Sequence, residues 1–262
     1  MSDSGPSYHF ITEDFLDAAE ANDLAAAARL LDDGAHVNAS DKGGATALIW
    51  AARHGNLDFV HLLLSRGAER ECVDNFGLTP LLAAVAVGRG DFAGELLKLQ
   101  FNAAARGQVR GETALALAAG QGDAVLVGRL VAAGADIDAR NSNGVTPLIE
   151  AVREARLDVA RVLLDLHADV DAPDSDGRTA LIHAVTTGRP DFVSELLRKG
   201  ADISLCDRRG RSALDFASQW KLPAMRAALE ESFLAHTVSQ LRDGVDAPIE
   251  ALPPLRLKPQ PR

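Results

Sequence analysis

Two residues of this sequence, Glu150 and His183, have side chains of the types that carry out general acid–base chemistry. They are 33 residues apart, an interval at which other residues of the chain also recur. Equivalent positions in neighbouring copies of a stacked repeat lie side by side. The pair therefore has two interpretations: an ion pair, or a carboxylate–imidazole dyad that transfers protons.

No other group of residues in the sequence matches a known reaction centre. The chain lacks the phosphate-binding P-loop, the HExxH zinc motif, the GxSxG nucleophile elbow and any CxxC pair. Its seven histidines are scattered, and its two cysteines, Cys72 and Cys206, are 134 residues apart. We expect both thiols to be reduced and structural, and we predict no catalytic residue, metal site or cofactor.

Composition and charge narrow the classes of partner. The 262 residues carry a formal net charge of −10, and the sequence pI is about 5.1. Binding to a phosphate backbone needs clustered Lys and Arg, so we expect no nucleic-acid partner, and the acidic charge favours a basic protein. The sequence contains no apolar run of about eighteen residues and no secretory signal. We therefore expect no membrane contact and predict a cytoplasmic location.

The elements that would hold Glu150 and His183 are copies of one unit. A residue suited to cap the N-terminus of a helix recurs every 33 or 34 residues, at Thr46, Thr79, Thr113, Thr146, Thr179 and Ser212. Each cap is followed by Ala or Pro and then Leu, and is preceded by turn residues that include a glycine two positions earlier. We interpret each copy as a turn followed by two short helices.

The ends of these helices follow a second rule. Glycine stands at most of them, because a residue with positive φ ends a helix readily. Four of the glycine positions are occupied by other residues, namely Gln100, Ala155, His167 and Lys221. His167 is interpreted as structural, because histidine tolerates positive φ better than most residues.

A 33-residue unit that begins D-x-x-G-x-T-P-L and ends L-L-x-x-G-A-D resembles the ankyrin repeat. The resemblance implies an all-α solenoid of about seven stacked units, including degenerate caps, each a β-turn finger with an antiparallel helix pair. The expected repeat domain is 13–244, with units 13–40, 41–73, 74–107, 108–140, 141–173, 174–206 and 207–244. The expected tails are 1–12 and the Pro-rich 245–262, which should be extended or disordered, and an extra capping helix is expected up to about Gly244.

The ankyrin resemblance also implies a function. In that family the first helices and the fingers line a concave surface that binds other proteins. The resemblance therefore implies a non-catalytic protein-binding scaffold, one use of which is to inhibit or neutralise an enzyme or toxin. On the first helices the expected binding residues are Trp50, Arg53, His54, Glu150, Arg153, Glu154, His183 and Trp220. On the fingers they are Phe76, Leu78, Arg110, Glu112, Arg178 and Arg209.

Two alternatives remain at this point. In the first, the chain is an enzyme with a cryptic site around Glu150 and His183. In the second, it is a structural protein that self-assembles through the solenoid ends or the Pro-rich tail, whereas our own expectation is a monomer. The third unit also has one extra residue, and Gln108 stands where other units place Asp or Asn. This insertion is either neutral or bends the chain so that the finger at 109–112 points in a new direction.

Overall fold

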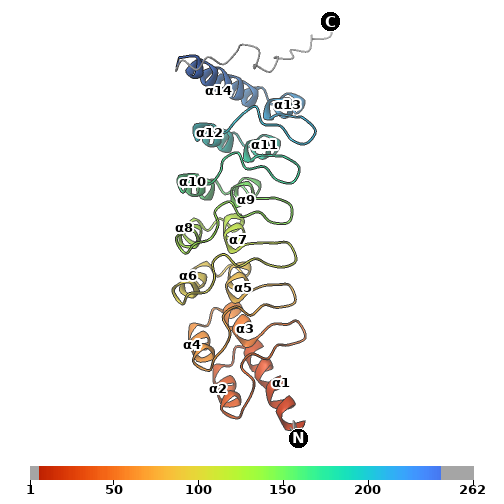
Figure 1. Ribbon diagram of the computed structural model, residues 1–262, viewed down its shortest axis with the longest axis vertical. Helices are drawn as coiled ribbons and strands as arrows, with labels where there is room; N and C mark the ends of the chain where they lie inside the picture. Colours follow the sequence, from red (N-terminus) through yellow and green to blue (C-terminus); the bar gives the residue numbers. More distant parts are fainter. Residues whose placement is uncertain (1–5, 243–262) are drawn as a thin grey trace.

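The structure, a computed structural model, describes residues 6–242 as an elongated stack of helix pairs (Figure 1). The first helices of the pairs are α1 (Pro6–Glu20), α3 (Ala47–His54), α5 (Pro80–Ala86), α7 (Ala114–Gln121), α9 (Pro147–Arg153), α11 (Ala180–Thr186) and α13 (Ala213–Gln219). The second helices are α2 (Leu24–Asp32), α4 (Leu57–Ser65), α6 (Gly90–Lys98), α8 (Ala124–Ala132), α10 (Leu157–Asp165), α12 (Pro190–Arg198) and α14 (Pro223–Arg242). The two sets form two columns, and the turn loops project from the column of first helices. The predicted all-α solenoid is confirmed.

The predicted N-caps begin the first helices from α3 to α13. In all six, the side-chain hydroxyl accepts a hydrogen bond from the backbone N–H three residues later, at 3.1 to 3.5 Å. Two of these helices have proline at the first position, where no intrahelical N–H bond is lost. Short helices of seven or eight residues are marginal alone, so these caps and the packing between units stabilise them.

The helix ends confirm that four other residues take the positions of helix-ending glycines. Gln100, Ala155, His167 and Lys221 all have positive φ, between 54° and 66°. They take the backbone conformation that glycine takes at the other helix ends, such as Gly188 with φ of 68°. An L-residue is strained there, so the stacking of the units must hold these four turns in place.

One hydrophobic core runs the length of the stack, from Phe15 to Leu229. Small residues allow the first helices of neighbouring units to pack closely. The alanines near the middle of these helices are completely buried: Ala51, Ala84, Ala118, Ala151 and Ala184. A unit thus buries its apolar surface mainly against its two neighbours, which is why the repeats cannot fold singly.

Backbone hydrogen bonds join neighbouring fingers. The N–H groups of Asn75, Ser142, Ser175 and Arg208 each donate to a carbonyl of the preceding finger, at 2.8 to 2.9 Å. Within residues 6–242, the equivalent bond from Gln108 is not formed. The extra residue of the third unit therefore interrupts the finger ladder at this junction.

Both ends of the stack differ from the regular units. Helix α14 is continuous from Pro223 to Arg242, so the separate capping helix expected before Gly244 is wrong. No glycine or proline follows Pro223 in this stretch to divide the helix. Helix α1 begins at Pro6 and so extends into the stretch assigned to a tail. The Pro-rich segment 245–262 lies outside the described residues. Among the residues that the structure describes, no helix has the length and apolar character to cross a bilayer.

Candidate functional site

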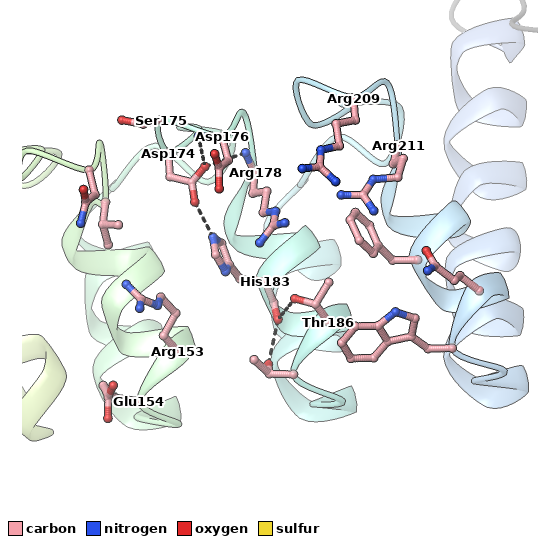
Figure 2. Close-up of a pocket in the computed structure, with 16 residues that line it drawn as sticks. Arg153, Glu154, Asp174, Ser175, Asp176, Arg178, His183, Thr186, Arg209 and Arg211 are labelled. Carbon is pink, nitrogen blue, oxygen red and sulfur yellow. Dashed lines mark hydrogen bonds and ion pairs between the residues drawn. The ribbon is translucent and has the colours of Figure 1, made fainter.

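A groove of about 790 Å³ lies along α9, α11 and α13 and beside the fingers that precede them (Figure 2). Its lining is mostly polar and comes from these helices and from the fingers, which are joined to one another by backbone hydrogen bonds. Six of the residues predicted from the sequence line it: Arg153, Glu154, Arg178, His183, Arg209 and Trp220. The backbone of the groove is therefore preformed, because each lining residue belongs to a helix or finger of the stack.

The turn aspartates organise this surface. In Asp174, one carboxylate oxygen, Oδ1, accepts hydrogen bonds from the backbone N–H groups of Asp176 and Arg178, both at 2.9 Å. The same two bonds are made by the equivalent aspartates Asp41, Asp74 and Asp207. The second oxygen, Oδ2, is left for a side-chain donor, and the donor differs from unit to unit.

In the unit of Asp174, the donor is His183. Its Nε2 lies 2.8 Å from Oδ2 of Asp174, and its side chain is largely buried. Burial lowers the pKa of His183, although the neighbouring Asp174 acts in the opposite direction, and the positive charges of Arg153 and Arg178 lower it further. Burial would raise the pKa of Asp174, but hydrogen bonds from Arg178 and His183 outweigh it and lower that pKa. At neutral pH a neutral imidazole therefore donates to a carboxylate.

Glu150 occupies the position of His183 in the preceding unit but has a different environment. Its Oε2 lies 3.4 Å from Nη1 of Arg153, and burial raises its pKa. The turn residue of this unit is Asn141, whose Oδ1 accepts from the same two backbone positions as the aspartates do. The amide of Asn141 is neutral, so the turn residue adds no charge beside Glu150, whereas the carboxylates of Glu154 and Glu112 raise the pKa of Glu150 further. Glu150 and His183 are thus bonded to Arg153 and Asp174 respectively.

Three predicted residues, Trp50, Arg53 and His54, form a cluster on α3. The indole Nε1 of Trp50 donates to Oδ2 of Asp41 at 2.9 Å, as His183 does to Asp174. Arg53 lies over the Trp50 ring at 4.8 Å, and its Nη2 donates to Oδ2 of the buried Asp74 at 2.8 Å. The ring of His54 stacks on Trp50, and its Nε2 lies 2.8 Å from the Glu20 carbonyl. These polar groups are all bonded within the protein.

The predicted finger residues in the middle of the stack lie apart from the groove. Phe76 is 63% exposed, whereas Leu78 is half-buried against the core. Arg110 and Glu112 form an exposed ion pair at 3.9 Å on the next finger. The structure therefore places these four residues on the fingers, as the sequence predicts, without joining them to the groove.

Arginine and aromatic side chains meet at the end of the groove formed by α13. The guanidinium carbon of Arg211 lies 4.4 Å from the centroid of the Phe216 ring, and that of Arg178 lies 5.9 Å from it. Arg209 points into the same space (Figure 2). Trp220 also lines the groove, and half of its surface is exposed. Arg211 and Phe216 are not among the predicted residues. The repeat interval could have found them, because they stand 33 positions after Arg178 and His183.

The chemistry available in this arrangement is recognition. Guanidinium groups and half-exposed aromatic rings are the side chains that most often anchor protein–protein interfaces. Among the described residues, no three His, Cys, Asp or Glu side chains are grouped so that they could hold a metal ion. Burial raises the pKa of both Cys72 and Cys206, which opposes formation of a reactive thiolate.

Family models match most of the described chain. The model for ankyrin repeats (3 copies) matches residues 15–105 and 92–174. The model for ankyrin repeats (many copies) matches residues 162–217. The matched ranges follow one another along the stack from α1 to α13 and include every residue that lines the groove except Gln219 and Trp220.

Several known proteins are similar to this chain in sequence or in structure. Human "Ankyrin repeat domain-containing protein 63" is 38% identical over 129 residues, which are 45% of this chain and 33% of that protein. The "Neurogenic locus Notch protein" of Drosophila melanogaster is 43% identical over 112 residues, 41% of this chain and 4% of that protein. The crystal structure of the ankyrin repeat domain of Bcl-3 has a TM-score of 0.70 at 28% identity, covering 78% of this chain and 92% of that one. The chain therefore matches at most 33% of the length of these two curated relatives.

Proposed function

Because this chain belongs to the ankyrin repeat family, whose repeats are protein–protein interaction modules, we propose that it binds another protein in the groove along α9, α11 and α13. The observation that carries this proposal is the groove itself, about 790 Å³ in volume and lined by helices and tied fingers. A preformed surface binds with a small ordering cost, so a few anchoring side chains can supply the affinity. We expect those anchors to be Arg178, Arg209 and Trp220.

A non-catalytic role agrees with the bonding of the two candidate acid–base residues. His183 donates to Asp174, and Glu150 is paired with Arg153. Among the described residues, no hydrogen bond or ion pair joins Glu150 to His183, so the two groups are not arranged as a proton-transferring dyad. Binding is therefore the function proposed for the groove, without an inhibitory role, since no feature of it favours inhibition over recruitment.

Affinity capture with quantitative mass spectrometry tests the binding function. The wild-type chain is compared with a groove variant that combines Arg209→Ala and Trp220→Ala, both of which change exposed side chains. The matched control combines Arg70→Ala and Leu166→Ala, which are also exposed and do not line the groove. We expect a set of proteins to be captured by the wild type and the control but lost by the groove variant.

The opposite result is equally clear. If the groove variant captures every protein that the wild type captures, in equal amounts, the partner binds elsewhere and the proposed function is wrong. Urea unfolding of the three proteins serves as a check on folding. We expect changes within about 0.5 kcal/mol for these surface substitutions, so that lost binding is not a consequence of lost structure.

A further inference from the structure

One end of the groove has a charge opposite to that of the whole chain. Three arginines, Arg178, Arg209 and Arg211, gather there, although the chain has a net charge of −10. We propose, as a step that rests on the binding function proposed for the groove, that this end binds an acidic segment of the partner protein. An Asp or Glu carboxylate of that segment would lie at the arginines, and a neighbouring apolar side chain would pack on Trp220.

The first support is that two of these arginines are not neutralised by the protein. Arg211 is bonded to the buried Asp207, with its Nη2 at 2.7 Å and its Nε at 3.0 Å from Oδ2. Arg178 and Arg209 form no ion pair with any residue between 6 and 242. Two positive charges are therefore available to a ligand at this end of the groove.

The second support is the way in which Arg178 is held. Its guanidinium and that of Arg211 lie on the ring of Phe216, which attracts cations through its π face. The Nε of Arg178 is buried and has no hydrogen-bond acceptor in the described chain. A ligand cannot reach this buried atom, but the Nη groups of Arg178 also make no hydrogen bond within the described chain and are not buried. A carboxylate can bind the Nη groups of a planar guanidinium through two parallel hydrogen bonds. A ligand carboxylate would thus satisfy a cation that is already in position.

The third support is the apolar surface beside the cations. Trp220 follows Phe216 by one helical turn and is 50% exposed. Tryptophan is among the residues most enriched at the centres of interfaces, where it packs against an apolar side chain of the partner. A segment that places an acidic residue beside an apolar one would therefore make both contacts at once.

The charges at the rim favour a carboxylate over a phosphate. Asp176 and Glu154 also line the groove, and they would repel a dianion more strongly than a monoanion. The acidic charge of the rest of the chain is largely screened beyond about 8 Å at physiological salt, so it does not prevent a carboxylate from reaching the arginines. The local charge therefore points to an acidic segment, in contrast to the basic partner that the net charge favours.

Peptide display provides a test that needs no knowledge of the partner. A library of random short peptides is selected on the full chain, and the most enriched peptide is synthesised with a fluorescein label. Its affinity is measured by fluorescence anisotropy, beside copies in which each Asp or Glu is replaced by the corresponding amide or by phosphoserine. The protein variants are Arg178→Gln with Arg209→Gln, Arg209→Gln alone, and Trp220→Ala.

A matched variant separates local contact from overall charge. Arg140→Gln with Arg208→Gln removes the same two charges from exposed positions that do not line the groove. We expect the selected peptides to be enriched in acidic residues that stand beside an apolar one. We expect the groove double variant to bind the peptide with an affinity at least about tenfold lower than that of the wild type. The matched variant should bind within about twofold of the wild type, and the amide copy should bind as weakly as the groove double variant binds the parent peptide.

Several results would overturn the inference. The inference is wrong if the selected peptides are not enriched in Asp or Glu, or if no peptide is enriched over selection on an unrelated protein. It is also wrong if the groove and matched double variants lose peptide affinity equally. A phosphoserine copy that binds more than about tenfold tighter than its parent would show that the site prefers a phosphate. Arg209→Gln changes an exposed residue, so it keeps the test valid if the double variant unfolds.

The same measurements distinguish this inference from the proposed function. If the selected peptides lose affinity with Trp220→Ala but not with the arginine variants, the groove binds proteins without recognising a carboxylate, and only the further inference is wrong. If the peptides lose affinity with none of the groove variants, both the acidic segment and the binding function of the groove are wrong.

Discussion

Two regions on the first-helix side of the stack, one at α3 and one at the last fingers, carry the same types of residue but bond them differently. At α3, Arg53 is paired with the buried Asp74 and Trp50 is bonded to Asp41. At the last fingers, Arg178 and Arg209 have no acidic partner in the described chain. The end with internally bonded arginine and tryptophan is suited to holding the stack together, and the end with free cations is suited to holding a ligand.

The turn aspartates explain this difference. Each needs one side-chain donor for Oδ2, and the donor can come from its own unit or from the unit before it. Asp74 has an alanine, Ala83, at the position of Trp50, so Arg53 of the preceding unit supplies the bond. Asp174 has His183 in its own unit, which leaves the neighbouring Arg153 and Arg178 free of that task. The residue at the helix position of Trp50 and His183 thus determines which arginine is left unbonded and can contact a partner protein.

The fingers differ between the two ends as well, and two glycines can test this. Gly77 and Gly210 have φ of 73° and 72°, but an added Cβ would lie 2.3 Å from the Gln108 nitrogen at Gly77 and would meet nothing within 4 Å at Gly210. We expect Gly77→Ala to lower the free energy of unfolding by about 2–5 kcal/mol, through backbone strain and overpacking. Gly210→Ala should cost about 1–2 kcal/mol, from strain alone.

Urea unfolding of both alanine variants measures this difference. Equal losses of stability would mean that the last finger is as closely packed as the inner ones, and the contrast between the two ends would lose its support in the fingers.

A pair of arginine substitutions tests the central contrast directly. Arg53→Ala leaves the buried Asp74 without its side-chain donor, and we expect the free energy of unfolding to fall by about 1–3 kcal/mol. Arg178→Ala removes no ion pair, so its cost in stability should stay below about 1 kcal/mol. Binding of an acidic peptide should show the reverse order. A loss of stability at Arg178 as large as that at Arg53 would contradict the assignment of one arginine to structure and the other to recognition.

The features that depend on a residue and its neighbours along the chain, such as helix caps and helix ends, could be predicted from the sequence. A hydroxyl at Thr179 caps a helix whatever its neighbours are, and His167 ends one because the repeat demands positive φ there. The bond from Arg53 to Asp74 joins residues in different units, and it depends on how closely those units stack. Trp50 and Arg53 therefore look like interface anchors in the sequence, whereas their polar groups are bonded inside the protein.

The two tryptophans offer a test with a smaller expected effect. Trp50→Phe keeps most of the ring but removes the indole N–H that donates to Asp41, and we expect a loss of about 1 kcal/mol in the free energy of unfolding. Trp220→Ala should change stability by less than about 0.5 kcal/mol, because the side chain is half exposed. Urea titrations followed by circular dichroism compare the two. A larger loss from Trp220→Ala would assign that residue to the structure of the last unit.

The smallest expected effect concerns pH, and it separates His183 from its counterpart Trp50. Burial lowers the pKa of His183 below its usual 6.5, so between the lowered value and 6.5 the unfolded chain binds a proton that the folded chain does not. The contribution of His183 to stability should therefore fall as the pH drops below 6.5 and should stop falling below the folded-state pKa. Trp50 does not titrate in this range, so its bond to Asp41 should be insensitive to this change.

His183→Gln tests this prediction, because the amide can still donate to Asp174 but does not titrate. We expect the wild type to lose more of its free energy of unfolding than the variant between about pH 7.5 and pH 5.5, as measured by urea unfolding. Other titrating groups, including Glu150, are common to both proteins, so the difference isolates the imidazole. Parallel losses in the two proteins would mean that His183 is not held neutral by burial, and the regions around His183 and Trp50 would then respond to acid in the same way.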